Sequence, residues 1–396
     1  MLTRDQIRPS PNRGPYLFYN GALWWLMRFL DGFLGLFHRP SECTISASPQ
    51  KILLCSQAHI GDAIIATSVL PIFAAAFPHA EIGFLINSVA IDVLADNPHV
   101  KHVHTFDHWR LNRNRIPLWQ KFKTDIQTRF RTIRELRRMH YDLAIDLYPY
   151  FPNSITPLYA AGIPVRLGWN SGGMAALLTH VENWADKEAH IVEWYKCMLK
   201  KIDACEPYLP LAKTELYVSE AIRGQWRVIA KKHHIPENYI IFHIGSGGVH
   251  RRWQTENWRK LAKLCTESGF PVVLLGHGKD EQEICLNIAK DNGDTFDLSG
   301  QLTWRVMTEC IGLSRLLVGL ESAAGHIAAA RNVTPICIYT GTTRTSCWMP
   351  YHTNAKVVVA DVPCSPCFLP NGCEGMECIK FTAPETIFSE IRSRIL

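Results

Sequence analysis

The chain has 396 residues, a net charge of +6 and an apolar fraction of 47%. This length suggests two domains, and the apolar content together with 20% charged residues is typical of a globular protein, which excludes a disordered or fibrous chain. Thirteen cysteines without a secretory signal favour a reducing compartment, with free thiols or a metal, over a disulfide framework.

Residues 1–50 are predicted to form an N-terminal extension, and it contains a strongly apolar segment from Gly21 to Arg39, "GALWWLMRFLDGFLGLFHR". Arg28 and Asp31 interrupt this segment, and it is short for a bilayer span, which needs ~20 apolar residues. A spanning helix is therefore disfavoured. Two interpretations stay open: an amphipathic helix on the membrane surface, or a helix packed against the body of the protein.

The first strand is predicted at Lys51 to Cys55, and Gly61-Asp62 with a helical pattern follows it. Open α/β sheets bind their ligands at such a junction, but neither a dinucleotide-binding nor a phosphate-binding glycine motif is present. A lone carboxylate stands there instead. Asp62 is either the N-cap of the helix or a functional group of the crevice, and composition does not decide between them.

Further strands are predicted at residues 80–87, 100–107 and 141–148, with a helix at 89–95. Strands that alternate with helices indicate a mostly parallel sheet covered on both faces. The proline-containing stretch 205–220 predicts the crossing to a second domain. The expected domains are therefore residues 51–210 and 211–396.

The helix before the fourth strand is strongly basic. From Arg110 to His140 the chain carries ten Arg or Lys residues against Asp125 and Glu135. This run is either a solvated helix face or a landing surface for an anionic partner such as a phosphorylated glycolipid, membrane headgroups or nucleic acid. Nucleic acid is the least favoured partner, because the helix lacks the interleaved aromatic residues that single-strand binders use.

The second half repeats the plan of the first. A strand at residues 239–248 runs into a glycine-rich loop and is followed by an amphipathic helix at 258–268. Strand-helix units follow at 270–290 and 316–332, and a last strand is predicted at 334–343. Two doubly wound α/β domains with a cleft between them suit an enzyme that brings two substrates together.

Two loops of the second half have the composition of a phosphate site. In "HIGSGGVHRRW" (residues 243–253), Gly245, Gly247 and Gly248 allow close backbone approach, while Ser246 and two arginines offer a hydroxyl and positive charge. In "VGLESAAGHIAAA", residues 322–326 open a helix whose free N–H groups would bind an anion. The agreement of the two loops favours a phosphate or diphosphate ligand over a flexible turn.

Together these motifs resemble glycosyltransferase family 9, the ADP-heptose:lipopolysaccharide heptosyltransferases. The resemblance runs from about Lys51 to the C-terminus and rests on "IGDAIIATSVLPIFAAAFPHAEIGFL", the H-x-G strand end with a basic residue two before Trp253, "FDLSGQLTW" and "ESAAGHIAAARNVTPICIYTGTT". It implies the GT-B fold, in which two Rossmann-like domains face a central cleft. It also implies an inverting transfer from an ADP-sugar, with Asp62 as the general base and no catalytic metal.

The same resemblance implies a donor site in the second domain. Its residues would be His243, Ser246, Arg251, Glu281, Leu302, Thr303, Glu321, Ser322 and His326. Ser246 and Arg251 would hold the phosphates, Glu281 the ribose, and Leu302 and Thr303 the adenine. The chain departs from the family pattern where Glu321 replaces Asp, Ala323 replaces Gly and Arg251 replaces Lys.

A cysteine-rich loop lies near the C-terminus, with Cys364, Cys367, Cys373 and Cys378 within fifteen residues. This spacing suits a tetrahedral Cys₄ site for structural zinc or iron, and the alternative is a cluster of reduced thiols. Some related protein heptosyltransferases bind iron through such a loop, which favours the metal.

The leading hypothesis is transfer of a heptose, or a related sugar, from an ADP-sugar to an anionic glycolipid acceptor of the lipopolysaccharide core. The enzyme would be cytoplasmic and peripheral on the inner face of the inner membrane, without a nucleic-acid partner. Two alternatives are a heptosyltransferase that acts on a protein and a non-catalytic, membrane-associated member of the family.

Overall fold

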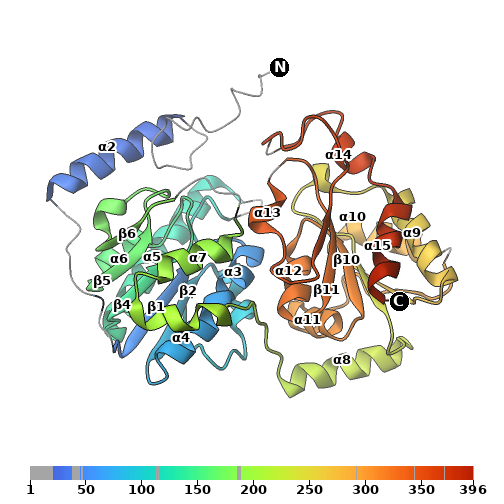
Figure 1. The fold of residues 1–396 in the computed structure, drawn as a ribbon, viewed down its shortest axis with the longest axis horizontal. Coiled ribbons are helices and arrows are strands. Elements are labelled where there is room, and N and C mark those ends of the chain that lie inside the picture. Colours follow the sequence, from blue (N-terminus) through green and yellow to red (C-terminus); the bar gives the residue numbers. More distant parts are fainter. Residues whose placement is uncertain are drawn as a thin grey trace. The chain divides into compact units, whose positions relative to one another are not determined.

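The computed structural model describes residues 21–37, 45, 48–112, 114, 116–184, 189–290, 292–342, 344–369 and 371–395. The chain divides between Lys213 and Thr214 into two compact units, here called the N-terminal unit and the C-terminal unit. The predicted boundary at residue 210 lies three residues before this division. Each unit contains its own parallel sheet (Figure 1).

The sheet of the N-terminal unit has the strand order β3-β2-β1-β4-β5-β6, and all five pairs of neighbouring strands are parallel. Residues 52–55 of the central strand are fully buried, as expected for a parallel sheet covered on both faces. The strands are β1 Lys51–Ser56, β2 Glu81–Ile86, β3 His102–Thr105, β4 Leu143–Asp146, β5 Val165–Trp169 and β6 His180–Glu182.

Helices cover this sheet. Helix α5 packs against α6, and α4 packs against the 3₁₀ segment η4. The helix expected at 89–95 is the 3₁₀ segment η2, and the expected crossing at 205–220 begins as η4, which belongs to the N-terminal unit. The helical segments are α3 Ile60–Ala66, η1 Thr67–Val69, α4 Leu70–Ala76, η2 Ser88–Leu94, α5 Leu118–Met139, α6 Ile155–Ala160, η3 Ala175–Leu177, α7 Ile191–Leu199 and η4 Asp203–Leu211.

The apolar N-terminal segment forms helix α2, Gly21–Phe37, which contacts η3. Trp24 and Met27 are buried, so one side of α2 is packed against the N-terminal unit. Of the helices in the described ranges, none combines the length and the apolar character that crossing a bilayer demands.

The sheet of the C-terminal unit has the order β12-β11-β10-β7-β8-β9, again with parallel neighbours. Counted from β7, this order is the same as that of the first sheet counted from β1, and it is the order of a dinucleotide-binding Rossmann sheet. The strand predicted as the last, β11, is followed by β12. The strands are β7 Ile240–His243, β8 Val272–Leu275, β9 Thr295–Asp297, β10 Leu316–Leu320, β11 Thr334–Ile338 and β12 Lys356–Val358.

The helices of the C-terminal unit bury large aromatic and branched side chains against this sheet. Trp258 of α9 lies 5.4 Å from Phe242 of β7 between ring centroids, and Ile387 and Ile391 of α15 are fully buried in the same core. The helical segments are α8 Glu220–Lys232, η5 Val249–Arg251, α9 Thr255–Glu267, α10 Lys279–Ala289, α11 Trp304–Gly312, α12 Ala323–Ala330, α13 Thr345–Trp348, α14 Glu377–Lys380 and α15 Pro384–Ile395.

Candidate functional sites

Asp62 lies at the third position of α3, and His59 is the N-cap. The backbone N–H of His59 donates to Oδ2 of Asp62 at 3.2 Å. The interpretation of Asp62 as the N-cap is therefore wrong by three residues, although its carboxylate does satisfy the backbone where the helix begins. Asp62 remains half-buried, so stabilising the first turn of α3 does not prevent its carboxylate from meeting a ligand.

A second carboxylate, Asp146, lies at the carboxyl end of β4. The backbone N–H groups of Ser154 and Tyr148 donate to it at 2.7 and 3.2 Å. Burial raises the pKa of Asp146 to about 7. The phenol of Tyr195 lies within electrostatic reach of both carboxylates: burial raises its pKa, and the charges of Asp62 and Asp146 raise it further. Strands β1 and β4 are neighbours, so their carboxyl ends bring these groups together.

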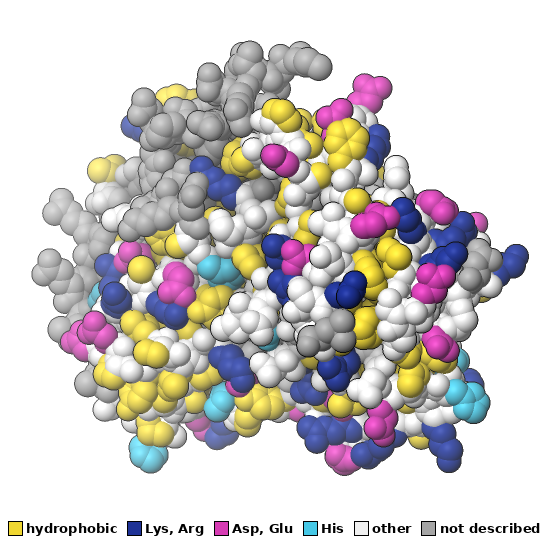
Figure 2. Space-filling model, turned by 45° about the vertical axis from the view of Figure 1, so that its right-hand side comes forward, with side chains coloured by type: hydrophobic (Ala, Val, Ile, Leu, Met, Phe, Trp, Pro, Cys, Tyr) yellow, Lys and Arg dark blue, Asp and Glu magenta, His cyan; other side chains and the backbone are white. Residues whose placement is uncertain are grey.

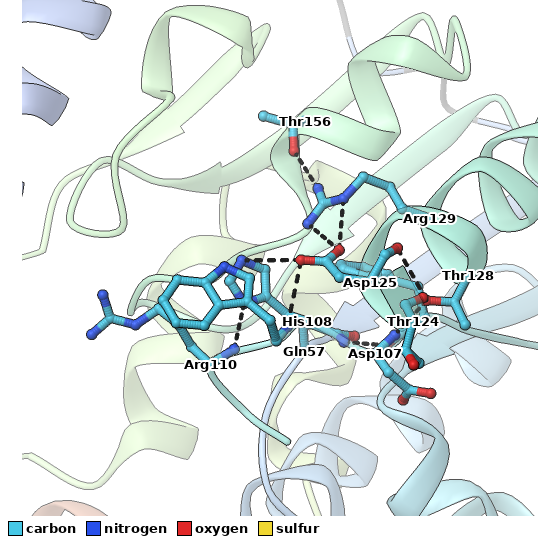
Figure 3. Close-up of polar contacts among 11 residues, drawn as sticks. Gln57, Asp107, His108, Arg110, Thr124, Asp125, Thr128, Arg129 and Thr156 are labelled. Carbon is cyan, nitrogen blue, oxygen red and sulfur yellow. Dashed lines mark hydrogen bonds and ion pairs between the residues drawn. The ribbon is translucent and has the colours of Figure 1, made fainter. Parts of the chain in front are cut away.

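A polar network fixes the loop that follows β3 (Figure 3). Nε2 of Gln57, in the loop that leads to Asp62, donates to the carbonyl of Phe106 at 2.5 Å. Asp125 of α5 forms an ion pair with Arg129 at 3.0 Å and accepts the backbone N–H of Trp109 at 3.4 Å. This network ties the loops after β1 and β3 to one helix, because a buried carboxylate needs such partners.

The guanidinium of Arg110 lies next to this network but is not part of it. Burial lowers the pKa of His108 to about 4, so this ring is neutral at pH 7 and Arg129 balances the charge of Asp125. In Figure 3 the guanidinium of Arg110 points away from the other residues drawn. It lies 5.8 Å from the ring centroid of Trp109 and 5.7 Å from that of Phe151. An arginine held over aromatic rings keeps its N–H groups available for an anion.

In the C-terminal unit the predicted donor residues follow four neighbouring strands, β10, β7, β8 and β9. Nδ1 of His243, at the end of β7, lies 3.4 Å from Oγ of Ser322, which follows β10. Glu281 accepts the backbone N–H of His277 at 2.8 Å. Burial lowers the pKa of His243, and the negative charge of Glu281 raises it. The carboxyl edge of the sheet therefore gathers residues that are far apart in the sequence.

Arg251 and Glu321 form an ion pair in this edge, with 2.9 Å between Nη1 and Oε1. Burial raises the pKa of Glu321, while the charge of Arg251 acts in the opposite direction. Both residues depart from the pattern of the family that the sequence resembles. The structure shows that these two substituted side chains, the carboxylate of Glu321 and the guanidinium of Arg251, pair with each other.

Helix α12 begins two residues after Glu321. Its N-cap, Ser322, has an extended backbone and makes no side-chain bond to the first turn, which leaves the N–H groups of that turn to an anionic ligand. His326 lies in the same helix and is buried. A Cβ at Gly325 would lie 2.7 Å from Sγ of Cys337. The small residue is thus required for packing on β11.

Three further predicted residues have local partners. The hydroxyl of Ser246 donates to the carbonyl of Gly248 at 2.8 Å, inside its own loop. Oγ1 of Thr303 accepts the N–H of Val306 at 3.3 Å and caps α11. Leu302 precedes this cap and is half-buried. The ligand roles of these residues stay predictions.

The four cysteines of the C-terminal loop do not form the expected metal site. Within the described ranges, no group of three or more His, Cys, Asp or Glu side chains lies close enough together to hold a metal ion. Cys378 is buried at α14 in the core of the C-terminal unit, whereas Cys364 and Cys373 are exposed. Burial and the charges of Cys367, Cys373 and Cys378 raise the pKa of Cys364, so the four thiols lie within electrostatic reach of one another.

Comparison with known proteins identifies the family of this chain. The family model of glycosyltransferase family 9 (heptosyltransferase) matches residues 129–374. The chain belongs to this family. The family consists of glycosyltransferases, so the chain is an enzyme. The prediction of the family from sequence motifs is confirmed.

Two curated relatives are lipopolysaccharide heptosyltransferases from different organisms. Lipopolysaccharide heptosyltransferase 3 of Escherichia coli K12 is 22% identical over 307 residues, which cover 74% of this chain and 83% of the relative. Lipopolysaccharide heptosyltransferase 1 of Pseudomonas aeruginosa is 23% identical over 319 residues, which cover 80% and 86%.

Solved structures show the same fold. A family 9 glycosyltransferase from Veillonella parvula has a TM-score of 0.70 at 18% identity and covers 89% of this chain and 98% of its own. The ADP-heptose lipopolysaccharide heptosyltransferase II of E. coli has a TM-score of 0.64 at 22% identity, with coverages of 87% and 98%. The predicted α/β class with two Rossmann-like domains of GT-B type is confirmed.

Proposed function

We propose that this family 9 enzyme is an inverting glycosyltransferase that moves a heptose, or a related sugar, from an ADP-sugar to an anionic acceptor of the lipopolysaccharide core. The observation that carries the proposal is the different chemistry of the two sheet edges. One edge offers α12 and Arg251 for a diphosphate, and the other offers a half-buried carboxylate, Asp62, at the start of α3.

In the proposed reaction the carboxylate of Asp62 takes the proton from an acceptor hydroxyl while that oxygen attacks the anomeric carbon of the donor. The new bond forms on the side opposite the diphosphate, whose bond to the sugar breaks, so the anomeric configuration inverts. The bonding electrons leave with ADP. The N–H groups of α12 and the guanidinium of Arg251 stabilise this negative charge, and the proton remains on Asp62.

The donor assignment is supported by the relatives. The curated relatives are lipopolysaccharide heptosyltransferases, and similar solved structures include an E. coli heptosyltransferase with ADP and one with ADP-2-deoxy-2-fluoro heptose. In this chain His243, Ser246, Glu281, Leu302, Thr303, Ser322 and His326 are proposed to complete the donor site.

The pair formed by Arg251 and Glu321 supports an active enzyme over a non-catalytic one. The two substituted positions form a part-buried ion pair at 2.9 Å, so the substitutions keep a cation in this loop. A guanidinium can still present its remaining N–H groups to a phosphate.

The acceptor is proposed to be an anionic glycolipid, because Arg110 presents a cation on two aromatic rings, and its own loop is bonded to the loop that leads to Asp62. An acceptor of this kind is lodged in a membrane. The enzyme is therefore proposed to be cytoplasmic and to work peripherally at the inner face of the inner membrane.

The test is calorimetry with ADP-heptose, ADP and UDP-sugars, followed by transfer to a delipidated core acceptor and assignment of the product anomer by NMR. Binding of ADP and ADP-heptose, weak binding of UDP-sugars and an inverted product are expected. Tighter binding of UDP-sugars, or a product with retained configuration, would contradict the proposal.

A further inference from the structure

Helix α2 has two apolar sides, and only one of them is covered by the protein. Trp24 and Met27 are buried, and Leu34 packs against Ile155 and Leu177 of the N-terminal unit. Trp25, Phe29, Phe33 and Phe37 follow each other at four-residue spacing and therefore share the opposite side. Each of these four side chains is at least half exposed, and Leu36 beside them is 76% exposed.

Helix α5 exposes a second apolar stripe. Trp119, Phe122, Ile126 and Phe130 lie on one side of this helix at spacings of three and four residues, and Trp119 is 63% exposed. The expectation that the basic helix lacks interleaved aromatic residues is therefore wrong. Three of its exposed residues are aromatic.

Positive charge borders the stripe of α5. Lys123, Arg134 and Arg138 are exposed on the adjoining side of the helix. On the face drawn in Figure 2, basic and acidic side chains are intermingled over much of the surface. Helix α5 differs, because its seven basic residues stand against Asp125 and Glu135, and Asp125 is buried against Arg129.

Both helices that carry these exposed stripes belong to the N-terminal unit. Helix α2 contacts η3, η3 contacts α6, and α6 contacts α5. Both helices are therefore linked to the same unit through shared neighbours.

We infer that the outer sides of α2 and α5 form one docking surface for an anionic lipid bilayer. Aromatic residues beside cations are the composition of helices that lie in a membrane interface, where the rings enter the headgroup boundary and the cations meet acidic lipids. Charge complementarity selects a lipid surface over a second copy of this chain, whose own α5 would bring like charges together. The inference rests on the proposed function only for its biological purpose, since it concerns lipid binding without transfer.

The experiment is flotation of the full-length protein with vesicles of phosphatidylcholine alone and of phosphatidylcholine with phosphatidylglycerol. One variant removes the outer side of α2 (Trp25→Ala, Phe29→Ala, Phe33→Ala), and another removes the stripe of α5 (Trp119→Ala, Ile126→Ala, Phe130→Ala). A third replaces the charges (Lys123→Gln, Arg134→Gln, Arg138→Gln). The matched control removes three exposed apolar residues of the C-terminal unit (Val228→Ala, Leu286→Ala, Phe381→Ala).

The wild type is expected to float with the anionic vesicles and far less with the neutral ones. Either apolar variant should lose about tenfold in apparent lipid affinity, and the charge variant should lose its preference for anionic lipid. The control should match the wild type, and all four variants should keep the wild-type melting temperature.

Three outcomes would overturn the inference. They are a wild type that stays unbound, apolar variants that float like the wild type, and a wild-type dimer in sedimentation that the α2 variant dissociates, which would make this face an interface between copies. A fourth such outcome is tight binding of an oligonucleotide that competes with the vesicles, which would assign α5 to nucleic acid. Lipid binding without transfer to a delipidated acceptor would instead contradict only the proposed function.

Discussion

The two units have the same strand order but opposite chemistry at the carboxyl edges of their sheets. The C-terminal unit places an ion pair, hydroxyls and the open start of α12 there, whereas the N-terminal unit places the carboxylates of Asp62 and Asp146 there. The core residues of the strands set the order, and the loops set the ligands. A shared topology therefore indicates where each substrate binds and says little about what that substrate is.

The largest effect is expected when the edge of the N-terminal unit loses its base. Asp62→Asn should lower kcat about 10²–10⁴-fold, the range of general base catalysis, while ADP affinity stays unchanged. The asparagine keeps an oxygen that can accept the N–H of His59, so α3 should still form. Steady-state transfer assays and calorimetry with ADP measure both quantities.

Asp92→Asn is the matched control, because it removes one exposed carboxylate from η2 in the same unit. It should leave kcat unchanged. A kcat of Asp62→Asn within a few-fold of the wild type would show that the carboxylate only stabilises the helix.

A substitution at the sheet edge of the C-terminal unit should change the affinity for the ADP-sugar donor. Arg251→Ala removes a cation from the diphosphate and leaves Glu321 without its ion-pair partner, so ADP-sugar affinity should fall about tenfold to hundredfold, as for a lost charge-assisted hydrogen bond. Arg251→Lys should recover part of the loss. Calorimetry measures the affinities.

Arg259→Ala, which breaks the exposed pair with Glu256, serves as the control. If Arg251→Ala binds ADP as tightly as this control does, the donor lies elsewhere and the contrast between the two edges fails.

The N-terminal unit should also carry a pH dependence of its own. The pKa of Asp146 is raised to about 7 by burial, so the folded protein holds a proton that the unfolded chain releases near pH 4. Stability should therefore fall as the pH rises from about 4 to 7, by up to ~1.4 kcal/mol per pH unit from this group. Asp146→Asn should remove that slope, measured by urea unfolding at several pH values.

The change of slope is the readout, because the amide also disturbs the bonds from Ser154 and Tyr148 and lowers the stability at every pH. Asp142→Asn loses comparable bonds from Gln50 and Lys51 and provides the control. Equal slopes for Asp146→Asn and the wild type would mean that Asp146 is ionised throughout this range.

The smallest effect is expected in the cysteine loop, which lies outside both edges. Because Cys364 is exposed and no described group of side chains forms a metal site, Cys364→Ser should shift the melting temperature by no more than ~2 °C, with or without a chelator. A chelator-dependent drop in the wild type that is absent in Cys364→Ser would restore the Cys₄ site.

Much of the architecture could be predicted from the sequence. The apolar runs that form β1, β2, β4, β7, β8, β10 and β11 were predicted because parallel strands covered on both faces are continuous in hydrophobicity, and β3 lies within the strand predicted at 100–107. Strands β5, β6, β9 and β12 were not predicted. Three of them, β6, β9 and β12, have three residues each, which is too short for a periodic pattern.

The sequence by itself determined the family, the two repeated domains and the residues that end the strands, since these follow from motifs and local patterns. Only the tertiary structure decided what those residues touch. It placed Asp62 at the third position of α3, joined Arg251 to Glu321 across seventy residues, buried Cys378 in the core of the C-terminal unit, and divided α2 into a packed side and an exposed side. Contacts of this kind depend on how distant segments pack, and no local pattern of residues encodes that.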